Sequence, residues 1–310
     1  MERPAESIVI DCVDGVRLRG HRWSPQGLRP QGVIIINPAT GVRASYYHRY
    51  AQFLAEHDFE VLTYDYRGIG ASRPESLKHS TFCWRDWGEK DFEAVLRFSH
   101  GRSGLSPQVI GHSIGGFLPG LAPSHPLISR MLTVGAQFAW WGDYQKSQRL
   151  QLFFKWHVVM PVLTACCGYF PGKRLGWLED LPKGVANEWS LRRSRLERSY
   201  PKALRDGVLN SLRAFKAPIL AVAVSDDPLG TVSAIGRALT YYIGAHSQLA
   251  MISPADYHRA SIGHFDLFHD RHRLGFWQPS ILWLRDGRHP WCERRLFPRR
   301  CYNRSQKQCV

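Results

Sequence analysis

Gln108-Val109-Ile110-Gly111-His112-Ser113-Ile114-Gly115-Gly116 is the stretch from which the fold of this chain can be predicted. Its apolar start is typical of a strand, and the Gly-His-Ser-Ile-Gly that follows is typical of a sharp turn into a helix. Such a turn strains the backbone at Ser113 and leaves no room for side chains two positions away, where Gly111 and Gly115 stand. The pattern predicts a serine nucleophile above the free N–H groups of a helix start, which suit a developing oxyanion. A glycine-rich turn with an incidental serine is the alternative.

Apolar strands and amphipathic helices alternate on both sides of this turn. Residues 33–36 and 61–64 have the pattern of buried strands, and Tyr46, Tyr50 and Phe53 recur at helical spacing between them. We also expect an N-terminal hairpin of residues 7–10 and 16–23. Three later strands are expected at residues 131–134, 218–224 and 248–252, and a closing helix at residues 277–284. This alternation predicts an α/β fold with a mainly parallel central sheet flanked by helices.

The alternation stops in the middle of the chain and again at its end. Residues 139–206 show no strand pattern, which predicts a helical lid inserted into a core of residues 1–138 and 207–284. Residues 285–310 are basic, poor in aliphatic side chains and without periodicity. This composition predicts a flexible C-terminal tail.

The predicted lid contains an apolar, aromatic run from Leu150 to Phe170. The run approaches the length of a membrane span, but Lys155, His157 and Pro161 interrupt it. We therefore expect no stable membrane span. The aromatic residues either give an apolar wall to a substrate cleft or seal the insertion onto the core.

The formal net charge of +15 is concentrated in the predicted lid and tail. Residues 139–206 hold twelve Lys and Arg against six Asp and Glu, and residues 285–310 hold eight against two. Such basic surfaces either bind nucleic acid or anionic membranes, or are simply solvated. We favour a solvated surface and expect no nucleic-acid partner.

The spacing of cysteines, histidines and glycines argues against several other functions. The seven cysteines lack the spacing of a disulfide framework or a zinc site. Gly68-Ile69-Gly70 lacks the third glycine of a dinucleotide fingerprint. We therefore expect no metal and no cofactor. Residues 1–6 are partly acidic and have no apolar run, so we expect no secretory peptide and a cytoplasmic location.

Candidates for a catalytic triad each follow a predicted strand. A serine hydroxyl needs a base to activate it, and the base needs a carboxylate to orient it. Ser113, then Asp226 or Asp227, then His264 would meet at the carboxyl ends of parallel strands. Spacing does not separate the two adjacent carboxylates, so both stay candidates.

Four motifs in this order resemble those of α/β-hydrolases over residues 7–284. They are Gly111-His112-Ser113-Ile114-Gly115-Gly116, Tyr64-Asp65-Tyr66-Arg67-Gly68-Ile69-Gly70-Ala71-Ser72, Ser225-Asp226-Asp227-Pro228 and Ile262-Gly263-His264-Phe265. The chain is especially similar to a branch of bacterial predicted hydrolases whose substrates are undetermined. The resemblance implies an α/β-hydrolase fold and a triad of Ser113, Asp227 and His264. Asp227 is preferred because the family's acid commonly precedes a proline-containing turn.

The resemblance also implies an oxyanion hole made of two backbone N–H groups. One belongs to Ile114. The second comes from the loop after residues 33–36, where many relatives have His-Gly and this chain has Pro38-Ala39-Thr40-Gly41. If Pro38 takes the place of the histidine, Thr40 supplies the donor, because proline has no N–H. Asp65 and Arg67 are expected to hold the neighbouring loop in shape.

These features predict a serine hydrolase that cleaves a small-molecule ester or thioester through an acyl-enzyme. The aromatic lid favours an apolar acyl group, and its arginines would attract an anionic portion such as a coenzyme A tail. Two alternatives stay open: an acyltransferase with the same triad, and a non-catalytic basic binding protein on a hydrolase scaffold.

Overall fold

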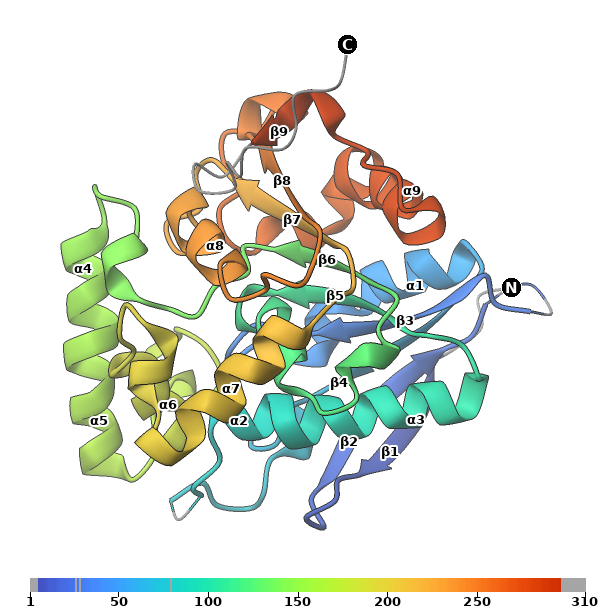
Figure 1. The fold of residues 1–310 in the computed structure, drawn as a ribbon. Helices are drawn as coiled ribbons and strands as arrows, with labels where there is room; N and C mark the ends of the chain where they lie inside the picture. Colours follow the sequence, from blue (N-terminus) through green and yellow to red (C-terminus); the bar gives the residue numbers. More distant parts are fainter. Residues whose placement is uncertain (1–4, 26, 28, 79, 297–310) are drawn as a thin grey trace.

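In the computed structural model, which describes residues 5–25, 27, 29–78 and 80–296, the chain forms a sheet flanked by helices (Figure 1). The nine strands of the sheet have the order β1-β2-β4-β3-β5-β6-β7-β8-β9. They are β1 (Glu6–Asp11), β2 (Arg17–Trp23), β3 (Gly32–Asn37), β4 (Phe59–Tyr64), β5 (Gln108–His112), β6 (Arg130–Val134), β7 (Ile219–Val224), β8 (Ser247–Ile252) and β9 (Arg295–Leu296). Strands β3 to β8 pair in parallel, whereas β1, β2 and β9 pair antiparallel. The predicted α/β fold with a mainly parallel sheet is confirmed.

The central strands are buried on both faces, so consecutive residues point to opposite layers of helices. The helices of these layers are α1 (His48–Glu56), α2 (Trp84–Asp86), α3 (Glu93–Ser103), α7 (Lys202–Ala214), α8 (Val232–Leu239) and α9 (Gln278–Asp286). Ile34 and Ile36 of β3 belong to the apolar cluster that includes α1 and α9. Ile35, between them, belongs to the cluster that includes α3 and α7. The run of β-branched residues thus builds two cores at once.

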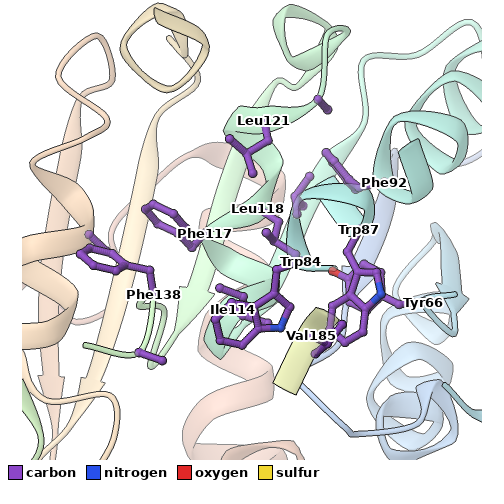
Figure 2. Packing of buried hydrophobic residues seen from close by; sticks show 14 of the residues in the cluster. Tyr66, Trp84, Trp87, Phe92, Ile114, Phe117, Leu118, Leu121, Phe138 and Val185 are labelled. Carbon is purple, nitrogen blue, oxygen red and sulfur yellow. The ribbon is translucent and has the colours of Figure 1, made fainter. Parts of the chain in front are cut away.

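Buried aromatic residues support the turn that carries Ser113 (Figure 2). The rings of Tyr66 and Trp87 stack with their centroids 4.5 Å apart. Ile114 and Phe117, from the turn itself, belong to the same cluster, and so does Val185 from the segment between β6 and α7. One continuous core therefore connects the sheet, the turn and the inserted segment.

The segment between β6 and α7 is built of short helices that lie together at one side of the sheet (Figure 1). They include α4 (Arg149–Phe153), the π-helical η8 (Phe154–Val159), α5 (Met160–Cys167) and α6 (Lys183–Ser190). The lid boundary expected at residue 206 falls inside α7, whose Val208 and Leu212 are buried in the core. Helix α7 therefore connects the inserted segment directly to the core.

Helices α4, η8 and α5 run on as one helix over Arg149–Cys167. Among the described residues it is the one helix long and apolar enough to cross a membrane by length and composition, with 19 residues and a mean hydropathy of 1.4. Trp156 and Met160 are buried against the rest of the protein. The opposite side exposes apolar side chains, namely Leu150, Phe154 and Val162. One side of this helix is thus anchored in the protein, and the absence of a stable membrane span stays a prediction.

The C-terminal segment departs from the predicted flexible tail. Trp291 is buried and stacks on Phe276 with ring centroids 5.6 Å apart. Strand β9 then pairs with β8. The prediction was wrong for residues 285–296, because one buried tryptophan can order a segment whose composition is otherwise polar. Residues 297–310 of the predicted tail lie outside the described residues.

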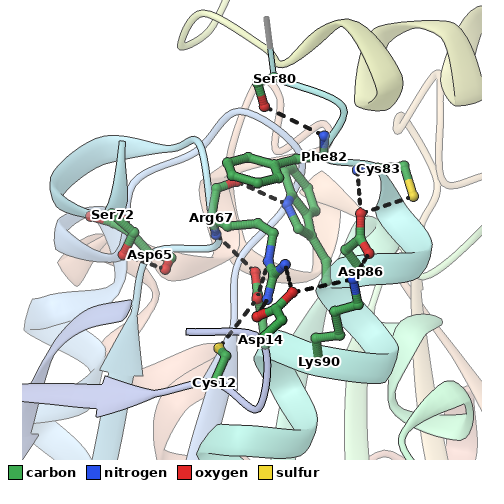
Figure 3. A network of polar contacts seen from close by, with 12 residues as sticks. Cys12, Asp14, Asp65, Arg67, Ser72, Ser80, Phe82, Cys83, Asp86 and Lys90 are labelled. Carbon is green, nitrogen blue, oxygen red and sulfur yellow. Dashed lines mark hydrogen bonds and ion pairs between the residues drawn. The ribbon is translucent and has the colours of Figure 1, made fainter. Parts of the chain in front are cut away.

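A buried ion-pair network holds the loop that follows β4, as Figure 3 shows. The Arg67 guanidinium is almost fully buried and contacts Asp91 through Nε (2.5 Å) and Asp14 through Nη1 (2.6 Å). Asp65 accepts a hydrogen bond from the backbone N–H of Ala71 (2.8 Å). Removing one partner of a buried ion pair leaves an uncompensated charge, which costs about 3–5 kcal/mol. These contacts are consistent with the structural role expected for Asp65 and Arg67.

Candidate active site

Ser113 lies at the turn between β5 and the short helix η4 (Ser113–Gly116). Its φ of +54° is in the left-handed region, which residues with a side chain rarely adopt. A Cβ atom on Gly111 would lie 2.3 Å from the Cα of Gly116, and one on Gly115 would lie 2.5 Å from the carbonyl oxygen of Asn37. The glycines are therefore required by steric contact, and they hold Ser113 in one strained conformation.

His264 and Asp227 form a buried hydrogen-bonded pair at the same end of the sheet. Asp227 follows β7, His264 lies in the loop after β8, and the His264 Nδ1 is 2.6 Å from Asp227 Oδ2. The other carboxylate oxygen, Oδ1, accepts hydrogen bonds from the backbone N–H groups of Leu229 and Gly230, both at 2.8 Å. Burial alone would raise the pKa of Asp227, but His264 and these N–H groups outweigh it and hold the pKa below its usual value. An ionised Asp227 keeps the proton on Nδ1 of His264 and leaves Nε2 free to accept one.

Asp226 has a different contact set from its neighbour. Its Oδ2 accepts the backbone N–H of Ile262, and its Oδ1 accepts that of Gly263, both at 2.9 Å. Of the two carboxylates that spacing left open, Asp227 thus contacts the histidine, and Asp226 ties the histidine loop to the end of β7.

Two glycines that the sequence analysis missed surround the His264–Asp227 pair. A Cβ on Gly135 would lie 3.0 Å from both Asp227 Oδ2 and His264 Cε1, and the φ of Gly135 is +57°. A Cβ on Gly230 would lie 2.5 Å from Asp227 Oδ2. Gly135 follows β6 and Gly230 follows Asp227, and glycines near strand ends often mark a close approach of the backbone to another group. These positions in the sequence could have indicated that both glycines pack against the His264–Asp227 pair.

A second histidine, His112, connects the nucleophile turn to the base. Its Nε2 donates to the backbone oxygen of His264 (2.8 Å), and its Nδ1 lies 2.7 Å from the Tyr47 hydroxyl. The Tyr47 oxygen in turn accepts the backbone N–H of Ala39 at 3.0 Å. Burial, reinforced by His264, lowers the pKa of His112 to about 3, so its ring is neutral at physiological pH.

The two predicted oxyanion residues line the same cavity as Ser113 and His264. The Ala39 amide is engaged by Tyr47, whereas the Thr40 amide has no acceptor within the residues that the structure describes. The Ile114 amide lies in the first turn of η4, where N–H groups lack an acceptor inside the helix. Two amides are thus available on adjoining walls of the cavity.

The cavity has a volume of about 840 Å³ and lies between the sheet edge and the inserted segment that joins β6 to α7. The inserted segment contributes aromatic lining, including Trp156, Trp177 and Trp189. Trp156 and Trp189 also stack on each other with centroids 4.5 Å apart. Trp156 and Trp189 thus form a wall of the cavity and also pack against the core, so both functions expected of the aromatic residues are met.

Comparison with protein-family models matches residues 33–292 to the Alpha/beta hydrolase family. This chain belongs to that family. No curated protein matches the sequence. One solved structure of similar fold is the alpha/beta hydrolase GrgF from Penicillium sp. sh18, with a TM-score of 0.59 and 16% identity over 92% of this chain and 100% of that chain. Another is the esterase EaEST from Exiguobacterium antarcticum, with a TM-score of 0.59 and 15% identity over 90% of this chain and 99% of that chain. A monoacylglycerol lipase from Paleococcus ferrophilus has a TM-score of 0.56 and 12% identity over 86% of this chain and 98% of that chain. At these identities the likeness shows the fold.

The sequence of this alpha/beta hydrolase family member pointed to Ser113, Asp227, His264, Ile114 and Thr40, and the structure gathers all five around one cavity edge. Within residues 5–25, 27, 29–78 and 80–296, no group of three or more His, Cys, Asp or Glu side chains could hold a metal ion. The arrangement can therefore deliver a serine oxygen, a proton acceptor and two amide donors to one bound group.

Proposed function

We propose that this alpha/beta hydrolase family member is a serine hydrolase that cleaves an ester or thioester through an acyl-enzyme. The observation that carries the proposal is the 2.6 Å hydrogen bond between Asp227 and His264, in a cavity that Ser113 also lines. A serine in a strained turn, a histidine and a buried carboxylate form the constellation of nucleophilic acyl transfer on this fold.

In the proposed mechanism, His264 Nε2 takes the hydroxyl proton as Ser113 Oγ attacks the substrate carbonyl carbon. The carbonyl oxygen becomes an oxyanion and accepts hydrogen bonds from the N–H groups of Ile114 and Thr40. The tetrahedral intermediate collapses, His264 returns the proton to the leaving oxygen or sulfur, and the acyl group stays on Ser113. Water, deprotonated by His264, then attacks the acyl-enzyme, and His264 returns that proton to Ser113 Oγ as the carboxylic acid leaves. Asp227 stays ionised throughout and stabilises the imidazolium that forms twice in the cycle.

The aromatic walls of the cavity support an apolar acyl or leaving group. Similar solved structures include an esterase and a monoacylglycerol lipase, which supports a carboxylic ester as the first substrate class to test. An acceptor other than water would use the same acyl-enzyme. Product analysis with and without a competing alcohol separates hydrolysis from acyl transfer.

The proposal is tested by labelling with a fluorophosphonate probe and by hydrolysis of para-nitrophenyl esters of graded chain length. The wild-type protein is expected to label and to hydrolyse the esters, and Ser113→Ala is expected to do neither while keeping its circular dichroism spectrum. Ser45→Ala is the matched control, because Ser45 also lines the cavity but does not lie in the strained turn after β5. Ser113 would be removed from the mechanism if Ser113→Ala were still labelled. The same holds if labelling were lost in Ser45→Ala and kept in Ser113→Ala.

A further inference from the structure

The charged side chains that line the cavity differ in how they are neutralised. Glu179 binds Arg43 through Oε1 (2.7 Å) and Lys173 through Oε2 (3.0 Å), so Arg43 of the lining has a carboxylate partner, which it shares with Lys173. Lys155 lines the same cavity, and no carboxylate of the described residues pairs with it. Among the described residues of the lining, Lys155 is thus the Lys or Arg side chain without a carboxylate partner.

The Lys155 ammonium is held in place by aromatic rings. Its Nζ lies 4.5 Å from the centre of the Trp156 ring and 4.1 Å from that of Trp177. Ring faces attract a cation, but they offer no lone pair to its three N–H donors. Lys155 is therefore a positioned cation whose three N–H donors have no acceptor among the described residues.

We propose that Lys155 binds a carboxylate group of the substrate on the lid wall of the cavity. The inference rests on the proposed function and narrows its substrate class to esters or thioesters that carry one negative charge besides the bond that is cleaved. Arg43, the other Lys or Arg side chain of the described lining, already binds Glu179, so the single ammonium of Lys155 matches a monoanion. Aromatic walls accommodate the apolar chain between that anion and the scissile carbonyl.

The electrostatics of the wall agree with this assignment. Burial lowers the pKa of the Lys155 ammonium, because the charged form loses hydration. A carboxylate bound at hydrogen-bond distance favours the charged form again. Binding of an anion thus removes an electrostatic cost that the free protein carries at this residue.

The test compares carboxylate and neutral esters of equal length. Mono-para-nitrophenyl adipate is paired with para-nitrophenyl hexanoate for an anion on the acyl side, and para-carboxyphenyl hexanoate with phenyl hexanoate for one on the leaving side. Lys155→Met keeps a long apolar side chain between the rings and loses the charge. We expect it to lower the carboxylate-to-neutral ratio of kcat/KM about tenfold to a hundredfold in one pair, the effect of losing a charged hydrogen bond.

Two control variants make the comparison specific. Lys155→Arg keeps the cation and is expected to keep most of the preference. Lys146→Met removes an exposed lid lysine and is expected to keep the wild-type ratio. If Lys155 only fastens the lid through its rings, Lys155→Met lowers kcat/KM for both members of a pair equally. An unchanged ratio in both pairs overturns the proposal.

A binding measurement separates this inference from the hydrolase proposal. Isothermal titration of Ser113→Ala with monomethyl adipate and with methyl hexanoate requires no turnover. We expect monomethyl adipate to bind more tightly, and to lose this advantage in the Ser113→Ala, Lys155→Met double variant. Such binding in a protein that hydrolyses no ester refutes the hydrolase proposal and supports the anion site. Hydrolysis without any Lys155-dependent preference refutes the anion site alone.

Discussion

The Nε2 atom of His112 donates a hydrogen bond to the backbone carbonyl oxygen of His264 over 2.8 Å. Since a carbonyl oxygen only accepts, the proton of the neutral ring is on Nε2, and Nδ1 accepts from the Tyr47 hydroxyl. The residue beside the proposed nucleophile thus holds the backbone of the proposed base. Tyr47 extends the connection to Ala39, in the loop that carries Thr40.

His112 is expected to act as a positioning residue. In His112→Leu the carbonyl of His264 loses its donor, and we expect kcat for para-nitrophenyl ester hydrolysis to fall about tenfold to a hundredfold, because small displacements of catalytic groups are costly. His112→Gln can place an amide N–H near the Nε2 position and is expected to recover part of the loss. Equal kcat in the wild type and His112→Leu would contradict the positioning role.

The same histidine makes stability depend on pH. Its folded-state pKa of about 3 is below the ordinary value of 6.5, so the unfolded chain binds the proton more tightly. The contribution of His112 is therefore fully present above about pH 6.5 and is lost as the pH falls towards 3. Between about pH 6 and 4 the free energy of unfolding should fall by about 1.4 kcal/mol per pH unit from this group.

Chemical denaturation of the wild type and His112→Gln over this pH range checks that slope. Groups that titrate in both proteins contribute equally to their free energies of unfolding and cancel in the difference. The free energy of unfolding of the wild type should therefore exceed that of His112→Gln by less as the pH decreases. A difference in unfolding free energy that stays constant from pH 7 to pH 4 would show that His112 is not held neutral by the fold.

Asp227→Asn should inactivate the protein by reversing the tautomer of His264. The N–H groups of Leu229 and Gly230 both point to Oδ1, so an asparagine must place its oxygen there and its NH2 against His264 Nδ1. The proton of His264 then moves to Nε2, which can no longer accept one from Ser113. We expect kcat to fall about four orders of magnitude at neutral pH, measured with a para-nitrophenyl ester.

Asp226→Asn is the matched control for that variant. Each oxygen of Asp226 accepts one backbone N–H from the histidine loop, so the asparagine loses one of these two bonds. We expect a loss of about 1–3 kcal/mol in stability and a modest loss of kcat. A larger loss of kcat in Asp226→Asn than in Asp227→Asn would show that Asp226, and not Asp227, is the acid of the triad.

Gly115→Ala should prevent the nucleophile turn from forming. The added Cβ would lie 2.5 Å from the carbonyl oxygens of both Asn37 and Pro38, which are backbone atoms and cannot rotate away. We expect a strongly lowered Tm or insoluble protein. Gly207→Ala in α7 is the control, because its Cβ meets nothing within 4 Å and alanine is the better helix former by about 1 kcal/mol. A wild-type Tm for Gly115→Ala would refute the steric argument.

Local patterns in the sequence were sufficient for the fold class and for the residue types of the candidate site. Strand and helix periodicities depend on neighbours a few positions apart, and so does the need for Gly111 and Gly115 around Ser113. The prediction failed for residues 285–296 because composition describes only the segment itself. It carries no information on the distant residues against which Trp291 packs.

The sequence by itself thus determined the alternation of strands and helices along the chain, the nucleophile turn and the short set of acids and bases that could serve it. Only the tertiary structure decided that Asp227 rather than Asp226 meets His264, that His112 holds its carbonyl, and that Lys155 is left without a carboxylate among the described residues. The physical reason is that hydrogen bonds and ion pairs act over about 3 Å in space. Their partners here lie tens of residues apart along the chain, at distances that packing of the whole sheet and lid sets.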